Sequence, residues 1–211
     1  MLRFIAIKDQ IMPEYLDFIL RLGLFCLLHS LLAAPRFKRY LQQKTGTPLR
    51  GYRLAYNLVA CLSFFWVMLA WQSTQVIFVA PGIWSLIMSG LQLVVLVLAV
   101  NCLRQTGIAS FLGTDLKYSD DHDTLITSGC YSFVRHPLYL LGILFLVLMP
   151  VVTTRWIVLS GFSSAYFLLG ALIEEQRMLR KYGRRYAIYQ QQVPFLIPGS
   201  GTRYKAEESP R

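Results

Sequence analysis

The stretch GIWSLIMSGLQLVVLVLAVNCL, residues 82–103, contains no charged side chain. A bilayer core about 30 Å thick needs roughly 20 predominantly apolar residues in helical conformation. Because backbone N–H and C=O groups in hydrocarbon need partners within the same segment, this stretch predicts a transmembrane helix. The composition agrees, with 55% hydrophobic and 15% charged residues and a mean hydropathy of +0.46. The chain is therefore predicted to be an integral membrane protein.

Four further apolar stretches have the same character. The sequence predicts about five transmembrane helices, at residues 15–34, 52–70, 82–103, 137–152 and 156–173. The connection PVVTTRW, residues 150–156, is so short that the last two helices must form a tight antiparallel hairpin. No repeat or long linker divides the chain, and the alternation typical of barrel strands is absent. We therefore expect an all-α membrane protein with one domain over residues 1–211.

The distribution of charge predicts the orientation in the membrane. The formal net charge is +10, residues 36–53 carry six basic side chains and no acid, and residues 71–81 carry no charge. By the positive-inside rule the first segment is cytoplasmic, which places the N-terminus outside and the C-terminus in the cytoplasm. The basic residues also predict contact with anionic membrane lipid. A nucleic-acid partner is not expected, because no binding motif accompanies the charge.

The four cysteines do not form a metal-binding or redox pattern. Cys26, Cys61, Cys102 and Cys130 are too far apart for a C-x-x-C motif, and three of them lie within apolar stretches. We expect them to be small packing residues. No metal site is predicted.

The segment SFVRHPLYLLG, residues 132–142, places Arg135 and His136 directly before an apolar run. Proline is favoured at the first helical position, so Pro137 is expected to begin the fourth helix. The free N–H groups of that first turn would attract an anionic group such as a carboxylate. Gly142 would allow a close approach. An arginine that snorkels beside an interfacial aromatic residue remains an alternative interpretation.

Two cytoplasmic segments flank this helix start. The loop 104–135 is rich in aspartate and longer than a connection requires, which is typical of functional loops, although its acids also suit a solvated surface. Glu174 and Glu175 lie where the fifth helix leaves the membrane, where carboxylates are costly; pairing of Glu174 with Arg177 is the ordinary explanation. Beyond them, apolar and aromatic residues recur at intervals of three and four. This predicts an amphipathic C-terminal helix on the membrane surface, formed by Leu179, Tyr182, Tyr186, Tyr189 and Val193, with a kink at Gly183 and an end at Pro194.

These two segments carry a resemblance. SGCYSFVRHPLYLLG, residues 128–142, and EEQRMLRKYGRRYAIYQQQVPFLIP, residues 174–198, resemble the paired signature of the isoprenylcysteine carboxyl methyltransferase and phospholipid methyltransferase superfamily. The similarity covers residues 116–198. The N-terminal half, with HSLLAAPRFKRYL and YRLAYNLVA, is similar to the branch of bacterial membrane thiol methyltransferases, the methanethiol S-methyltransferases.

The resemblance implies an S-adenosylmethionine-dependent methyltransferase of the bacterial inner membrane that acts on a small lipophilic or thiol acceptor, with no obligate protein partner. Region 116–198 would hold the cofactor. The implied cofactor contacts are Thr124, Leu125, Ile126, Tyr131, His136, Pro137, Leu138, Tyr139 and Glu174. The implied catalytic residues are Arg135, Tyr139 and Glu174.

Departures from the family pattern concern the acceptor. Leu116 and Asp123 replace a glutamine and a histidine of the isoprenylcysteine enzymes, and Gly170 replaces an arginine four residues before the first glutamate. If that arginine orients a substrate carboxylate, its loss favours a thiol over a prenylcysteine. Carboxyl or phospholipid methylation remains an alternative, as do an NADPH-dependent sterol-type reductase and a non-catalytic membrane subunit.

Overall fold

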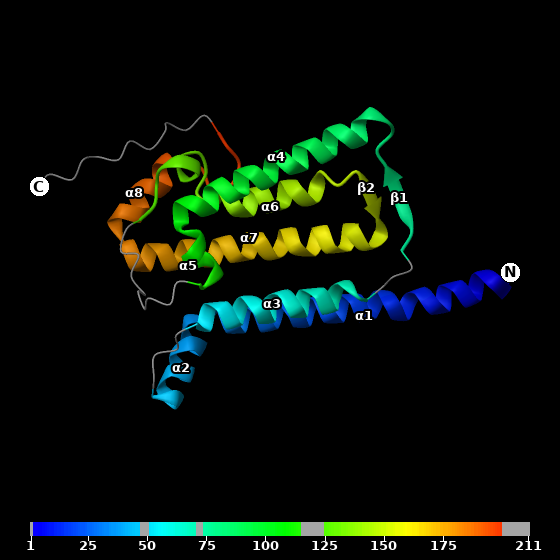
Figure 1. Ribbon diagram of the computed structural model, residues 1–211, viewed down its shortest axis with the longest axis horizontal. Helices are drawn as coiled ribbons and strands as arrows, with labels where there is room; N and C mark the ends of the chain where they lie inside the picture. Colours follow the sequence, from blue (N-terminus) through cyan, green and yellow to red (C-terminus); the bar gives the residue numbers. More distant parts are fainter. Residues whose placement is uncertain (1, 47–50, 71–73, 115–124, 200–211) are drawn as a thin grey trace, which may run out of the picture. The chain divides into compact units, whose positions relative to one another are not determined.

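The computed structural model describes residues 2–46, 51–70, 74–114 and 125–199 (Figure 1). The chain forms two compact units. The first comprises Met1–Gln75, Ala109–Ser119 and Thr153–Arg155, and the second comprises Val76–Ile108, Asp120–Val152 and Trp156–Arg211. Helices dominate both units, as the apolar stretches predict.

Within the described residues, three helices are long and apolar enough to cross a membrane. These segments are Glu14–Ala33 within α1 (Leu2–Ala33), all of α4 (Ile83–Thr106) and all of α7 (Thr154–Tyr182). The two other apolar helices are shorter, α3 (Tyr52–Met68) and α6 (Pro137–Val147). The prediction of a helical membrane protein is confirmed, with three rather than five helices of full spanning length.

The fourth predicted helix is shorter than the sequence indicated. α6 ends at Val147 rather than at residue 152, a length of about 16 Å for its 11 residues. Pro150 explains the end, because a proline disfavours helical conformation in the residue before it. The β-branched residues that follow form β2 (Val151–Thr153), which pairs with β1 (Val76–Val79). The all-α prediction missed this two-stranded ribbon.

The first unit is built on a pair of helices. α1 packs along α3, and Phe18, Leu22 and Val67 are fully or almost fully buried. The Tyr52 hydroxyl donates a hydrogen bond to the Leu32 carbonyl at 2.7 Å, which joins the end of α1 to the start of α3. The short helix α2 (Pro35–Thr45) stands between them in the chain.

The second unit is organised around α6. On one side Leu141 packs with Val95 and Cys102 of α4, and Gln92 of α4 donates a hydrogen bond to the Phe145 carbonyl at 3.0 Å. On the other side a Cβ added to Gly142 would lie 2.9 Å from the ring of Phe167 in α7, so the predicted close approach is confirmed. α6 and α7 run antiparallel, as the short connection predicts (Figure 1).

Two of the four cysteines are not simple packing residues. Cys102, at the end of α4, forms a disulfide with Cys130 in the 3-10 turn η1 (Gly129–Ser132). The prediction that all four cysteines are small packing residues is therefore wrong for this pair, whereas Cys26 and Cys61 are free. The cysteines are 28 residues apart, and only the fold brings them together. The disulfide holds the segment before α6 against α4.

The C-terminal helix also differs from its prediction. Gly183, with φ of 55°, separates α7 from α8 (Arg184–Gln192), so the predicted kink is confirmed. The aromatic face of α8 does not lie on a membrane surface, because Tyr186, Tyr189 and Val193 are buried together, with Leu125 against them. The amphipathic pattern of α8 therefore reflects the packing of its aromatic face within the second unit.

Candidate functional site

The site is built at the N-terminal end of α6. His136 is the N-cap residue and Pro137 begins the helix, as the sequence predicts. His136 makes no side-chain hydrogen bond to the first turn, so the N–H groups there lack a side-chain cap. The backbone N–H of Arg135 donates to the Pro194 carbonyl at 2.9 Å. The helix start is thus tied to the segment that follows α8.

Glu175 is the centre of a buried polar network. The Arg135 guanidinium donates to its two carboxylate oxygens, Nε to Oε1 at 2.9 Å and Nη2 to Oε2 at 3.1 Å. His136 Nε2 lies 2.8 Å from Oε1, and the Tyr186 hydroxyl donates to Oε1 at 2.6 Å. The Gln190 amide donates to Oε2. Four donor side chains from two segments, residues 135–136 and α8, therefore stabilise the ionised carboxylate of α7 inside the protein.

Arg135 extends the network to the end of α8. Its Nη1 donates to the carbonyl oxygens of Gln190 at 2.9 Å and Val193 at 2.5 Å. Its guanidinium carbon also lies 5.7 Å from the ring centroid of Phe195. One side chain before α6 thus joins α7 through Glu175 and α8 through two backbone acceptors.

Tyr186 and Tyr189 fix α8 in place. Burial, together with its hydrogen bond to Glu175, raises the pKa of the Tyr186 hydroxyl above its ordinary value, so it remains a donor. The Tyr189 hydroxyl donates to the Tyr131 carbonyl at 2.6 Å. α8 therefore positions the loop before α6 through Tyr189, and the Glu175 carboxylate of α7 through Tyr186.

Glu174 has a different environment from its neighbour. Its side chain is 39% exposed, against 11% for Glu175, and its Oε2 lies 3.7 Å from His136 Nδ1. The Tyr139 hydroxyl hydrogen-bonds to it. Burial, and then the negative charge of Glu174, raise the pKa of Tyr131 to about 12. A half-exposed carboxylate thus faces two tyrosines and an imidazole, an arrangement able to hold a cationic or hydroxyl group.

The structure brings together only part of the predicted site. Tyr131, His136 and Tyr139 gather around Glu174. The Arg135 side chain instead forms an ion pair with Glu175.

The other residues predicted to contact the cofactor are packed against α4 or α8, are buried or half-buried, or lie outside the described residues. Pro137 is buried, and Leu138 packs against the α4 cluster. Leu125 packs against α8, and Ile126 is half-buried. Thr124 lies outside the described residues, as do Leu116 and Asp123.

Sequence reasoning missed the residues that assemble the site. Glu175, Tyr186, Tyr189 and Gln190 are not among the predicted site residues, although Tyr189 and Gln190 follow Tyr186 in α8 by three and four residues. That spacing indicates one helix face. The signal was present, but it was assigned to the membrane surface.

His29, the histidine within the first predicted span, lies in the first unit. Its Nε2 is 2.7 Å from the hydroxyl of Tyr56 in α3, and its ring centroid lies 5.5 Å from that of Phe25. The polar group is therefore satisfied between α1 and α3.

Comparison of the amino-acid sequence with known proteins identifies relatives of the chain. The chain is 26% identical over 197 residues to a methanethiol S-methyltransferase of Crocosphaera subtropica, covering 86% of this chain and 74% of the relative. It is 27% identical over 207 residues to methanethiol S-methyltransferase 2 of Bradyrhizobium diazoefficiens, covering 92% and 77%. The enzyme of that name from Pseudomonas deceptionensis is 25% identical over 190 residues, covering 85% and 71%. No solved structure matches the chain.

These relatives confirm the resemblance to the bacterial branch of the isoprenylcysteine methyltransferase-like proteins. The family described as NnrU protein matches residues 17–197, a range that includes the first signature segment, all but the last residue of the second, and most of the apolar part of α1. The chain belongs to the NnrU protein family.

Proposed function

We propose that the chain is an integral membrane methyltransferase that transfers a methyl group from S-adenosylmethionine to a small thiol. The observation that carries this proposal is the half-exposed Glu174, held beside Tyr131, His136 and Tyr139 at an uncapped helix start. The relatives named methanethiol S-methyltransferase support a membrane methyltransferase. The whole of residues 1–211 would serve this activity, with the cofactor held by region 116–198.

The residues present fit the cofactor. The uncapped N–H groups at the start of α6 suit its methionine carboxylate, and Glu174 suits its ammonium group or ribose hydroxyls. When bound, the sulfonium supplies the methyl group. Since the positive charge of a sulfonium fades as the methyl group leaves, the protein needs mainly to align the reactants and exclude water. The thiol proton would pass to the His136 imidazole, whose Nδ1 lies 3.7 Å from Glu174 Oε2, or to a water beside it.

Gly170 supports a thiol acceptor. It lies one helical turn before Glu174, and a Cβ there would lie 3.5 Å from the Tyr139 hydroxyl oxygen. Position 170 therefore lies in ordinary van der Waals contact with Tyr139, so the cation that is absent at this position would have stood beside the Tyr139 hydroxyl. A prenylcysteine carboxylate would lose the cation expected there and would be costly to bury unpaired.

The activity test compares acceptors at matched concentrations in detergent and in lipid. The purified chain is expected to transfer labelled methyl groups from S-adenosylmethionine to methanethiol faster than to a farnesylcysteine analogue. Ester formation on the analogue at the higher rate would restore the carboxyl methyltransferase alternative. Binding of NADPH instead of S-adenosylmethionine would establish the reductase, and binding of the cofactor without turnover would indicate a non-catalytic subunit.

The proposed arrangement in the bacterial inner membrane has five spans, including the shorter α3 and α6, with the N-terminus outside and the C-terminus in the cytoplasm. Single cysteines at positions 45 and 74 test this orientation in intact cells. An impermeant thiol reagent added outside is expected to label position 74 and to leave position 45 unmodified, because residues 36–53 are basic and residues 71–81 are uncharged. The reverse pattern would contradict the topology.

A further inference from the structure

The helix α2 lacks the packing that normally stabilises a short helix. It has 11 residues, and none of them is buried. Helices shorter than about 12 to 15 residues are marginal in water, and in proteins most of their stability comes from packing of an apolar face. The contacts of α2 within the described residues leave its apolar face incompletely covered.

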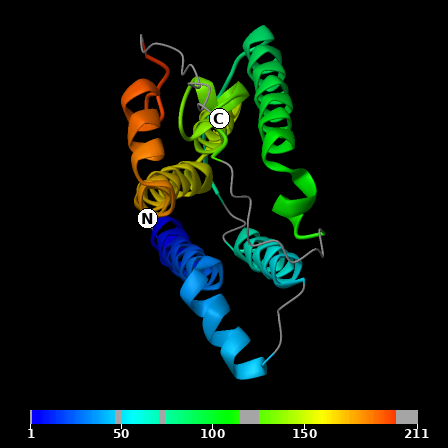
Figure 2. The same cartoon turned by 90° about the vertical axis from the view of Figure 1, so that its left-hand side faces the viewer.

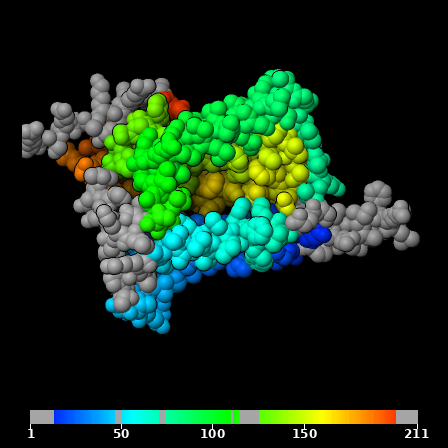
Figure 3. Space-filling model, viewed as in Figure 1, coloured from blue at the N-terminus to red at the C-terminus, as the bar shows by residue number. Residues whose placement is uncertain are grey.

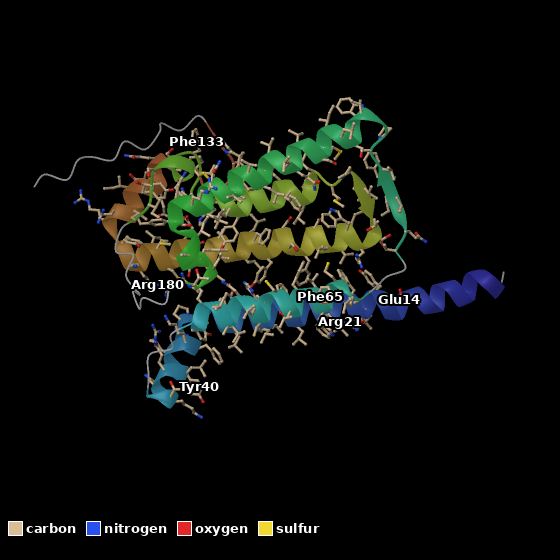
Figure 4. The ribbon with its side chains drawn as sticks, in the orientation of Figure 1. Glu14, Arg21, Tyr40, Phe65, Phe133 and Arg180 are labelled. Carbon is tan, nitrogen blue, oxygen red and sulfur yellow. A yellow bond between two sulfur atoms is a disulfide. The ribbon has the colours of Figure 1, made fainter. Side chains whose placement is uncertain are left out.

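One face of α2 is apolar. Phe37, Tyr40, Leu41 and Lys44 follow one another at intervals of three, one and three residues, which places them on the same side of the helix. Phe37 and Leu41 are half-buried, whereas Tyr40 is 51% exposed and projects from the helix (Figure 4). The Lys44 ammonium lies 5.4 Å from the centre of the Tyr40 ring, so its aliphatic stem follows the apolar face.

The charges of α2 are unfavourable for an isolated helix. Arg36, Lys38 and Arg39 lie near its N-terminus, the helix contains no acid, and Ala34 provides no side-chain cap. Cations at the positive end of a helix dipole are destabilising. An external anion would offset this repulsion and bind the arginines directly.

The position of α2 points to the source of that anion. The apolar segment Glu14–Ala33 ends two residues before α2 begins. α2 then leaves the end of α1 steeply, whereas α3 runs back beside α1 (Figures 1 and 2). In the space-filling view α2 projects beyond both helices (Figure 3). With α1 across the bilayer, a helix that leaves its end at a steep angle would run near the membrane plane, at the level of the headgroups.

We propose that α2 is an interfacial helix that binds anionic phospholipid headgroups. Its apolar face enters the boundary of the acyl chains, and its exposed arginines contact phosphate groups. The occupant is the bilayer itself, since only that surface offers apolar depth and negative charge together at the end of α1. This interaction is independent of the proposed methyl transfer.

The test uses the full chain in bilayer discs of phosphatidylcholine with about one third phosphatidylglycerol. A fluorophore is attached through Gln43→Cys, in a background in which Cys26 and Cys61 are serine. Energy transfer from this site to trace phosphatidylglycerol, compared with phosphatidylcholine carrying the same acyl-chain acceptor, measures local lipid enrichment. We expect about fivefold enrichment of the anionic lipid at low salt, the effect of one basic residue near the surface, and its loss at 1 M salt.

The variant Arg36→Gln/Arg39→Gln is expected to abolish most of this enrichment. Its matched control, Arg184→Gln/Arg185→Gln, removes the same charge from exposed positions in α8 and is expected to retain it. A fluorophore at Tyr40→Cys should also report a more apolar environment than one at Gln43→Cys. Equal enrichment in the two double variants, no enrichment in the original chain, or equal polarity at positions 40 and 43 would each overturn the proposal.

Discussion

Replacing Glu175 by glutamine is expected to destabilise the folded chain by about 3–5 kcal/mol, because the variant leaves the Arg135 guanidinium buried without its anionic partner. The two side chains are each only 11% exposed, so solvent cannot replace the lost interaction. The glutamine also presents an amide donor to a site where Arg135, Tyr186 and Gln190 already donate. Unfolding by denaturant in detergent, followed by tryptophan fluorescence, measures the change.

Glu174→Gln is the matched control for this stability measurement. It removes the same charge from the adjacent position, where the side chain is 39% exposed. Exposed charge pairs contribute about 0–1 kcal/mol, so its free energy of unfolding should stay within about 1 kcal/mol of the original value. Equal destabilisation by the two variants would show that Glu175 is not the structural centre of the network.

The largest expected effect on the cofactor comes from the same control variant. Glu174→Gln is expected to weaken the binding of S-adenosylmethionine by about 1.5–3 kcal/mol, the contribution of one hydrogen bond to a charged group. This corresponds to roughly a 10- to 150-fold increase in the dissociation constant. Calorimetric titration of the purified chain in detergent measures it directly.

Arg177→Gln supplies the comparison for the cofactor measurement. It lies one turn further along α7 and is exposed, and it changes charge by the same amount in the opposite sense. Its affinity for S-adenosylmethionine should remain within a few-fold of the original value. Unchanged affinity in Glu174→Gln would remove this residue from the proposed site.

The start of α6 could be predicted from the sequence because its cause is local. Pro137 suits only the first turn of a helix, and the structure places it there, with His136 as the N-cap. The burial of Glu175 and the partial exposure of Glu174 have no local cause in the sequence. Neighbouring helical residues point about 100° apart, and only the positions of α6 and α8 decide which carboxylate is buried.

Two of the remaining errors, the environment of α8 and the cysteine pairing, have their physical origin in long-range contacts. A period of three to four residues predicts that α8 has an apolar face, but protein and lipid satisfy that face equally well. The pairing of Cys102 with Cys130 likewise depends on the packing of η1 against α4. The end of α6 at Val147 was predictable, since Pro150 stands in the printed sequence; the apolar run obscured it.

The hydrogen bonds of Arg135 to residues 190–194 have a consequence for the order of events during synthesis. The last of these acceptors, the carbonyl of Pro194, lies 59 residues beyond Arg135 in the chain. Because Glu175 lies 40 residues after Arg135 and α8 follows it, the Arg135 guanidinium has none of these partners until α7 and α8 have been synthesised. A polypeptide cut short before Gln190 would retain the apolar helices α1, α3, α4, α6 and α7. It would lack the Gln190 amide and the backbone acceptors that complete the hydrogen-bond network of Arg135 and Glu175.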